Sequence, residues 1–302
     1  MTRDMTASVH QRLLNYARAT DRPFNQVLQY FTLERFLYRL GHSPHSRRFV
    51  PKGALMFVVW RASSIRPTRD IDLLGYLDNA VEHVAAVIGE ICREPVPEDG
   101  LFFDAESIAV QRIIEAADYA GVRVRFTAYL GTARIPMQID VGFGDPIVPG
   151  PILVRLPTIL DLPGPELQGY SRESMVAEKL QSMVRLGIVN SRMKDFYDVW
   201  VLSGSFEFDG LTLSQAIRET FRRRQTVIPL RPTAFGDVFA LDHEKQAQWT
   251  AFIDRLGQAD APVTLHKVVG DIAAFLRPVL DALIAESSFE RRWSPGGPWM
   301  QR

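Results

Sequence analysis

Two aspartates separated by one residue are the side chains of this sequence best suited to metal-dependent chemistry. The segment 68–73 reads Thr-Arg-Asp-Ile-Asp-Leu, and its apolar and polar residues alternate as in a half-buried strand. Side chains two apart on a strand point to the same face, so Asp70 and Asp72 would present two carboxylates side by side. Hard anionic oxygens at that separation suit Mg²⁺, which leaves coordination positions for water and phosphate oxygens.

A third carboxylate and a glycine turn extend this candidate site. Asp140 lies on the polar face of a second alternating segment, 135–142. If the two strands are neighbours, three carboxylates converge, as two-metal phosphoryl or nucleotidyl transfer requires. Upstream, Lys52-Gly53-Ala54 begins a predicted helix to about residue 61, whose first backbone N–H groups are placed to receive phosphates. The alternative is a solvent-facing strand, because charged residues normally alternate outward.

Two further motifs carry charge inside predicted helices. Lys179 falls within the apolar stripe of a helix predicted for residues 171–186. Because an unpaired buried ammonium is costly, Lys179 should face a cleft or a carboxylate, unless it extends along the stripe to water. In the next predicted helix, Asp195 and Asp198 share a face, and Lys194 is spaced to pair with Asp198. That pattern fits a functional site and a salt-bridged first turn equally well.

The elements that must position these residues fall into two predicted parts. After two leading helices, alternating segments at 68–74, 108–114, 122–129 and 135–142 predict strands, the last two joined by a turn at residues 131–132. Six prolines between residues 146 and 165 mark a linker-like stretch, and helical patterns follow. We therefore predict an N-terminal α/β domain over residues 1–160, with two leading helices, and a helical domain over residues 161–302.

Composition excludes several classes of protein. The chain has 302 residues, 46% of them hydrophobic, as in an ordinary globular protein. Lys+Arg and Asp+Glu are both 35, so a nucleic acid would have to bind a local patch. Arg123 and Arg125 are placed to line a cleft. The other candidates are Arg61, Arg66 and Arg69 near the predicted site and Arg218, Arg222, Arg223, Arg224 and Arg231 in the predicted helical domain. The single Cys92 excludes an internal disulfide, and the sequence pattern predicts a cytoplasmic protein with no membrane partner.

Together, these motifs resemble the AbiEii/AbiGii family of nucleotidyltransferase toxins, and the MenT-like group within it. The resemblance runs in order from about residue 48 to 203, and it is carried by segments 49–54, 66–75, 138–145, 177–180 and 192–198. Ala54 stands where relatives often have a second glycine, and no Ser or Thr follows it directly, which removes a hydroxyl contact to phosphate.

The resemblance implies a polymerase-β-like nucleotidyltransferase of the α+β class: a mixed sheet with flanking helices, followed by a C-terminal helical domain. It implies a Mg²⁺-dependent toxin that transfers a nucleotide from a nucleoside triphosphate to the 3′ acceptor end of tRNA, blocks translation and has a cognate antitoxin. Asp70, Asp72 and Asp140 are then metal ligands, and the catalytic residues are Asp70, Asp72, Lys179, which binds the triphosphate, and Asp195. The remaining implied nucleotide-binding residues are Lys52, Gly53, Arg66, Thr68, Arg69, Arg192, Lys194 and Asp198.

Other functions are compatible with the same residues. A phosphotransferase or a protein-nucleotidylating enzyme would use the same metal site. An inert protein that only binds RNA or a partner would carry the motifs without catalysis. The sequence leaves open which triphosphate and which tRNA are used.

Overall fold

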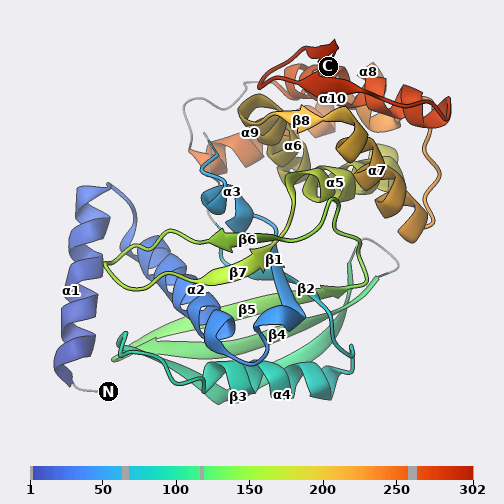
Figure 1. Ribbon diagram of the computed structural model, residues 1–302. Helices are drawn as coiled ribbons and strands as arrows, with labels where there is room; N and C mark the ends of the chain where they lie inside the picture. The colour runs from blue at the N-terminus through green and yellow to red at the C-terminus, as the bar shows by residue number, and fades with distance from the viewer. Residues whose placement is uncertain (1–2, 63–67, 116–118, 258–263, 302) are drawn as a thin grey trace. The chain divides into compact units, whose positions relative to one another are not determined.

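The computed structural model describes residues 3–62, 68–115, 119–257 and 264–301 (Figure 1). The chain forms two compact units, the first made of residues 1–61, 67–144 and 152–169, and the second of residues 62–66, 145–151 and 170–302. Arg66 lies outside the described residues. The predicted α+β class is confirmed, since a mixed five-stranded sheet stands in the first unit and the second unit is mainly helical.

The sheet of the first unit has the strand order β1-β2-β5-β4-β3. Its central pair, β2 and β5, is parallel, and all other neighbours are antiparallel. The strands are β1 (Phe49–Lys52), β2 (Ile71–Gly75), β3 (Leu101–Glu115), β4 (Tyr119–Leu130) and β5 (Ala133–Phe143). The predicted hairpin is present, and Gly131 in its turn has a φ of +61° that favours glycine. β3 begins earlier than the segment 108–114 predicted.

The helices of the first unit are α1 (Arg3–Ala19), α2 (Phe24–His42), η1 (Ser46–Arg48), α3 (Leu55–Val59) and α4 (Val81–Cys92). Of these, α2 and α4 contact the central and edge strands of the sheet, and α1 packs on α2. The alternation seen in the sequence determines which face is covered. Ile71 and Leu73 of β2 and Ile139 and Val141 of β5 are fully buried, which sends the intervening aspartates to the opposite face. α4 packs beside β3 (Figure 1).

The proline-rich stretch is not a simple linker. It contains a two-stranded sheet, β6 (Ile152–Arg155) and β7 (Glu166–Gly169), within the first unit. Pro151 and Pro165 stand just outside the paired residues, where no ladder hydrogen bond is lost. The sequence predicted a linker here, and that prediction failed because prolines at the ends of a strand limit its length without preventing the strand from forming.

A buried ionic cluster joins α2 to the segments that follow α4. Asp99 accepts two hydrogen bonds from Arg39, at 2.6 and 3.1 Å, and one from Arg35 Nε at 3.1 Å. Arg35 Nη1 also donates to the carbonyl of Pro163 at 2.7 Å. Because all three side chains are buried and paired, the cluster fixes α2 by directed bonds as well as by apolar packing.

Glu34, the neighbour of Arg35 on α2, should make stability depend on pH. Its Oε2 accepts from the backbone N–H of Ile159 at 2.9 Å, while Oε1 has no hydrogen-bond partner among the described residues. Burial raises the pKa of Glu34 from its ordinary value of 4.5 to about 7. Folding therefore favours the protonated form, so this stabilisation is complete below pH 4.5 and is lost as pH rises through 7.

We expect the free energy of unfolding to lose about 3 kcal/mol through Glu34 between pH 4.5 and pH 8. In Glu34→Gln this pH-dependent part should be absent, as measured by urea unfolding at half-unit pH intervals. The control is Glu82→Gln, an exposed glutamate of α4, which should leave the pH profile unchanged. Parallel profiles for Glu34→Gln and the wild type would contradict the assignment.

Four helices of the second unit begin with a side-chain cap. Ser171, Asp209, Asp242 and Thr264 each accept a hydrogen bond from a backbone N–H in the first turn of the helix that they precede. The elements are α5 (Arg172–Leu186), η2 (Gly187–Val189), α6 (Met193–Ser205), β8 (Phe208–Asp209), α7 (Gly210–Arg223), η3 (Thr233–Phe235), α8 (Asp237–Ala240), α9 (His243–Leu256), α10 (Leu265–Ile284), β9 (Arg291–Trp293) and β10 (Trp299–Gln301).

The small sheet of the second unit was not predicted. Its order is β10-β9-β8, and strands this short carry almost no alternation signal. Trp299 stacks on Phe275 of α10, and Trp293 packs at a tilt against both rings, which holds the C-terminal hairpin in place. In the described ranges of both units, each helix is too short or too polar to cross a membrane.

Candidate active site

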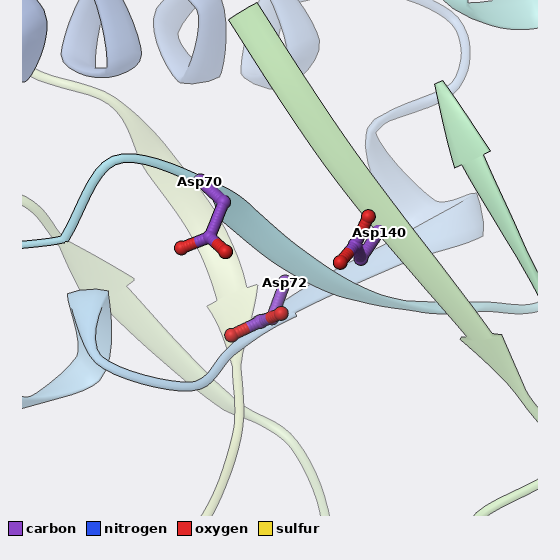
Figure 2. A group of neighbouring side chains, drawn as sticks. All are labelled: Asp70, Asp72 and Asp140. Carbon is purple, nitrogen blue, oxygen red and sulfur yellow. The ribbon is translucent and has the colours of Figure 1, made fainter. Parts of the chain in front are cut away.

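Three carboxylates gather on the polar face of the sheet. Asp72 on β2 lies directly opposite Asp140 on β5, and Asp70 stands immediately before β2. One carboxylate oxygen from each of the three lies within 4.8 Å of the others. Figure 2 shows the three side chains on the same side of these neighbouring strands. The proximity of Asp70, Asp72 and Asp140 that the sequence predicts is therefore present in the structure.

Basic residues flank the two facing aspartates. The strand register pairs Lys52 of β1 with Asp72, and Arg123 of β4 with Asp140. Residues directly opposite one another on neighbouring strands project from the same face. Lys52, Asp72, Asp140 and Arg123 therefore form one row across four strands, which we call the charged row. Its two outer cations offset the repulsion between its two inner carboxylates.

Asp140 is held by a two-bond contact with Arg123. Arg123 donates from Nε to Oδ1 and from Nη2 to Oδ2, both at 2.7 Å. Gln138 Nε2 approaches Oδ2 at 3.4 Å, and Arg125 Nε in turn donates to Gln138 Oε1 at 3.1 Å. Sequence reasoning placed Arg123 and Arg125 at a cleft but did not identify Asp140 as the partner of Arg123.

Asp70 is oriented by a residue of the segment that leads into β2. The hydroxyl of Thr68 donates to Asp70 Oδ1 at 2.9 Å and lies 3.1 Å from the Asp70 carbonyl. The next residue, Arg69, has an exposed side chain, and its backbone carbonyl accepts from Gln29 Nε2 at 3.3 Å. Thr68 thus contacts a predicted metal ligand, in addition to the nucleotide role that the resemblance implies for it.

Gly53 lies against Asp72. Its φ is +71°, a conformation that favours glycine, and an added Cβ would stand 2.0 Å from Asp72 Oδ2. The helix that follows, α3, has five residues and ends at Val59, short of the predicted residue 61. So short a helix has only a small dipole to offer a phosphate. The contribution of Gly53 that the structure shows is steric: it leaves room for the Asp72 carboxylate.

The second unit contains a separate ionic cluster on α5 and α6. Lys179 Nζ donates to Asp195 Oδ1 at 3.0 Å and to Asp198 Oδ2 at 2.6 Å, and Arg192 Nε donates to Asp195 Oδ2 at 2.5 Å. Lys194, which the spacing placed near Asp198, is exposed. Of the alternatives for Lys179, the structure therefore shows the one in which the ammonium faces carboxylates.

Charge in this cluster is strongly coupled. Burial alone would raise the pKa of Asp195, but the ammonium of Lys179 and the guanidinium of Arg192 outweigh it and hold that pKa below its ordinary value. Asp195 is therefore a buried anion at neutral pH. Its ion pairs with Lys179 also connect α5 to α6.

We expect Lys179→Met to lower the free energy of unfolding by about 2–3 kcal/mol. Asp195 would keep Arg192, whose side chain is partly exposed, but would lose Lys179, the cation that is largely buried beside it. Urea unfolding at pH 7 measures this loss. The matched control is Lys194→Met, an exposed lysine on the same helix as Asp195, which should stay within about 0.5 kcal/mol of the wild type. Equal losses in the two variants would contradict this account.

A further buried cluster contains motif residues to which the sequence assigned no role. Arg224 donates to both oxygens of Asp145 at 3.0 Å, and it also contacts Glu178 at 3.5 Å. Glu178 accepts in turn from the hydroxyl of Tyr170. Asp145 and Glu178 lie within two of the segments that carry the family resemblance, so the structure gives these positions an architectural function.

Arg224 was also predicted for a nucleic-acid patch, and that prediction is wrong because the side chain is largely buried in this cluster. A signal was present in the sequence. Arg224 continues the spacing of the buried residues Leu213, Ile217 and Phe221 along α7, so its side chain is directed inward. The other patch candidates in the predicted helical domain, Arg218, Arg222, Arg223 and Arg231, are exposed.

The predicted site residues thus form two sets. The carboxylates, Lys52, Gly53, Thr68 and Arg69 belong to the first unit, and the cluster around Lys179 belongs to the second. That both sets serve a single reaction remains a prediction.

Comparison with known proteins identifies a family of sequences and two similar solved structures. The sequence model of the family described as nucleotidyl transferase AbiEii toxin, type IV TA system, matches residues 35–285. No curated protein sequence matches the chain. Two crystal structures from Helicobacter pylori are similar at 10% identity: a suggested nucleotidyltransferase (TM-score 0.47, covering 96% of this chain and 100% of that chain) and JHP933 (TM-score 0.46, covering 95% and 97%). Likenesses this distant carry no argument about function.

Proposed function

Since this chain belongs to the AbiEii family of nucleotidyl transferase toxins of type IV toxin–antitoxin systems, we propose that it is a Mg²⁺-dependent enzyme that transfers a nucleotide from a nucleoside triphosphate to the 3′ acceptor end of tRNA. Such a modification blocks aminoacylation and hence translation. The observation that carries the proposal is the carboxylate triad, Asp70, Asp72 and Asp140, with ligand oxygens within 4.8 Å of one another.

The donor set fits divalent cations of this kind, because all three groups offer hard anionic oxygens. Asp70, Asp72 and Asp140 are the residues that would hold them. When bound, the cations would offset the charge of the triphosphate and lower the pKa of the attacking hydroxyl. The protein contributes orientation: Thr68 holds Asp70, Gly53 leaves room for Asp72, and Arg123 holds Asp140.

The nucleotide-binding residues come from both units in this proposal. In the first unit they are Lys52, Gly53, Thr68 and Arg69, and the resemblance adds Arg66, which lies outside the described residues. On α5 and α6 they are Lys179, Asp195, Arg192, Lys194 and Asp198. The two aspartates fix the ammonium of Lys179 before any ligand arrives. A cation ordered in advance loses less entropy when it binds a triphosphate.

The remaining partners follow from charge and family. RNA would contact the exposed arginines of the second unit, since the net charge of the chain is zero and provides no general attraction. The family implies a cognate antitoxin protein. The reaction would take place in the cytoplasm, where nucleoside triphosphates and tRNA are found.

Transfer of labelled phosphate tests the proposed function. Purified protein is incubated with total tRNA, Mg²⁺ and one of the four nucleoside triphosphates, labelled at the α position or, separately, at the γ position. We expect α label on the 3′ end of tRNA, no γ label on any acceptor, and no transfer when EDTA replaces Mg²⁺.

The same assay identifies the alternatives. The γ label on an acceptor would indicate a phosphotransferase, and α label on protein would indicate a protein-nucleotidylating enzyme. If no label is transferred from any triphosphate, while the protein still binds tRNA, the chain is a binding protein and the proposed activity is wrong.

A further inference from the structure

The geometry points to Arg123 as a positioning residue of the proposed reaction, which holds Asp140 in one orientation and competes with a divalent cation for its carboxylate. This inference rests on the proposed function, because the role of Asp140 as a metal ligand belongs to it. Arg123 is outside the segments that carry the family resemblance. Its assignment comes from its contacts alone.

The contact between Arg123 and Asp140 has a defined geometry. Arg123 and Asp140 are direct partners in the ladder between β4 and β5, and both hydrogen bonds measure 2.7 Å. A guanidinium bound through two parallel N–H groups fixes the rotation of a carboxylate about its Cβ–Cγ bond, which a single ammonium contact does not do. Asp140 is buried, with 6% of its surface exposed, so contact with water does not let the carboxylate rotate among several orientations.

Arg123 and a divalent cation compete for the carboxylate of Asp140. Both oxygens of Asp140 already accept hydrogen bonds from Arg123, so a cation that draws on either oxygen shares the carboxylate with the guanidinium or displaces it. Arg123 also places a positive charge two strands away from Asp72, on the same face of the sheet. Its removal leaves three carboxylates with less compensation, which strengthens their attraction for a divalent cation.

These two effects have opposite signs, and that makes the inference specific. Loss of Arg123 should tighten the binding of a cation to the free protein while it slows the transfer reaction, because a loosely oriented carboxylate is a poorer ligand in the transition state. Damage to the fold would weaken both properties together.

Mn²⁺ binding to the full-length protein, measured by electron paramagnetic resonance without nucleotide, provides a readout that is independent of catalysis. For Arg123→Gln we expect about 10-fold tighter Mn²⁺ binding and about 10- to 100-fold slower transfer. The slower transfer should appear as a lower kcat, while the KM for RNA stays unchanged. For Arg123→Lys, which keeps the charge but not the paired bonds, we expect Mn²⁺ binding like the wild type and slower transfer.

Two variants serve as references. Arg134→Gln removes an exposed arginine of β5 on the same face of the sheet as Asp140, and should match the wild type in both measurements. Asp140→Asn should weaken Mn²⁺ binding, and adding Arg123→Gln to it should slow transfer no further. Such non-additivity is expected when one residue acts through the other.

Three results would overturn the inference: unchanged Mn²⁺ affinity in Arg123→Gln, the same changes in Arg134→Gln, or a raised KM for RNA with unchanged kcat, which would make Arg123 an RNA contact. If Arg123→Gln does not fold, Arg123→Lys serves as the test. Transfer by that variant at the rate of the wild type would overturn the inference. Failure of the wild type to transfer any nucleotide would refute the proposed function, while the Mn²⁺ titrations would still decide whether Arg123 competes for Asp140.

Discussion

Asp70→Asn is expected to slow nucleotidyl transfer by about 10³-fold, equivalent to roughly 4 kcal/mol of transition-state stabilisation. The amide keeps the shape of the side chain, and its oxygen can still accept from Thr68, whose hydroxyl lies 2.9 Å from Asp70 Oδ1. What is lost is one anionic ligand of the three in the triad. The initial rate with α-labelled triphosphate and tRNA measures the effect.

The loss should be confined to chemistry. Asp70 is half-buried and its exchange for asparagine removes no apolar contact, so the free energy of unfolding should change by less than about 0.5 kcal/mol. Asp78→Asn is the matched control, because Asp78 is exposed beyond the other end of β2. Growth arrest on induction should persist with Asp78→Asn and disappear with Asp70→Asn. Transfer by Asp70→Asn within tenfold of the wild type would remove Asp70 from the metal site.

The carboxylate triad could be predicted because strand periodicity is a local property. Asp70, Asp72 and Asp140 stand on polar faces that alternation alone identifies. The register between β2 and β5 could not be predicted, since it joins strands 68 residues apart, as in the pairing of Asp72 with Asp140. Such pairings depend on the whole sheet and leave no mark within either segment.

The pairing of Arg123 with Asp140 was within reach of the sequence. The predicted two-residue turn at 131–132 sets Leu130 opposite Ala133, and counting back along both strands places Arg123 opposite Asp140. The ion pairs of Lys179 could be predicted only in part. Spacing within α6 shows that Asp195 and Asp198 share a face, but which helix packs on that face is decided by tertiary structure.

Gly53→Ala is expected to reduce transfer by about 10²- to 10³-fold, although residue 53 would supply no functional group. The new Cβ would lie 2.0 Å from Asp72 Oδ2 and 2.9 Å from Asp72 Cγ, closer than any non-bonded contact. Asp72 belongs to the triad and faces Asp140 across the β2–β5 ladder. The carboxylate must therefore leave its place, and a displacement of about 1 Å at a reacting centre is enough for a loss of this size.

Gly257→Ala separates this displacement from backbone strain. Gly257 has a φ of +65°, close to the +71° of Gly53, and in the described part of the chain nothing lies within 4 Å of its added Cβ. Both variants should lose about 1–2 kcal/mol of stability from the left-handed conformation, but only Gly53→Ala should lose transfer and Mn²⁺ binding. If Gly53→Ala transfers nucleotide as fast as Gly257→Ala, the turn at residue 53 does not position Asp72 for catalysis.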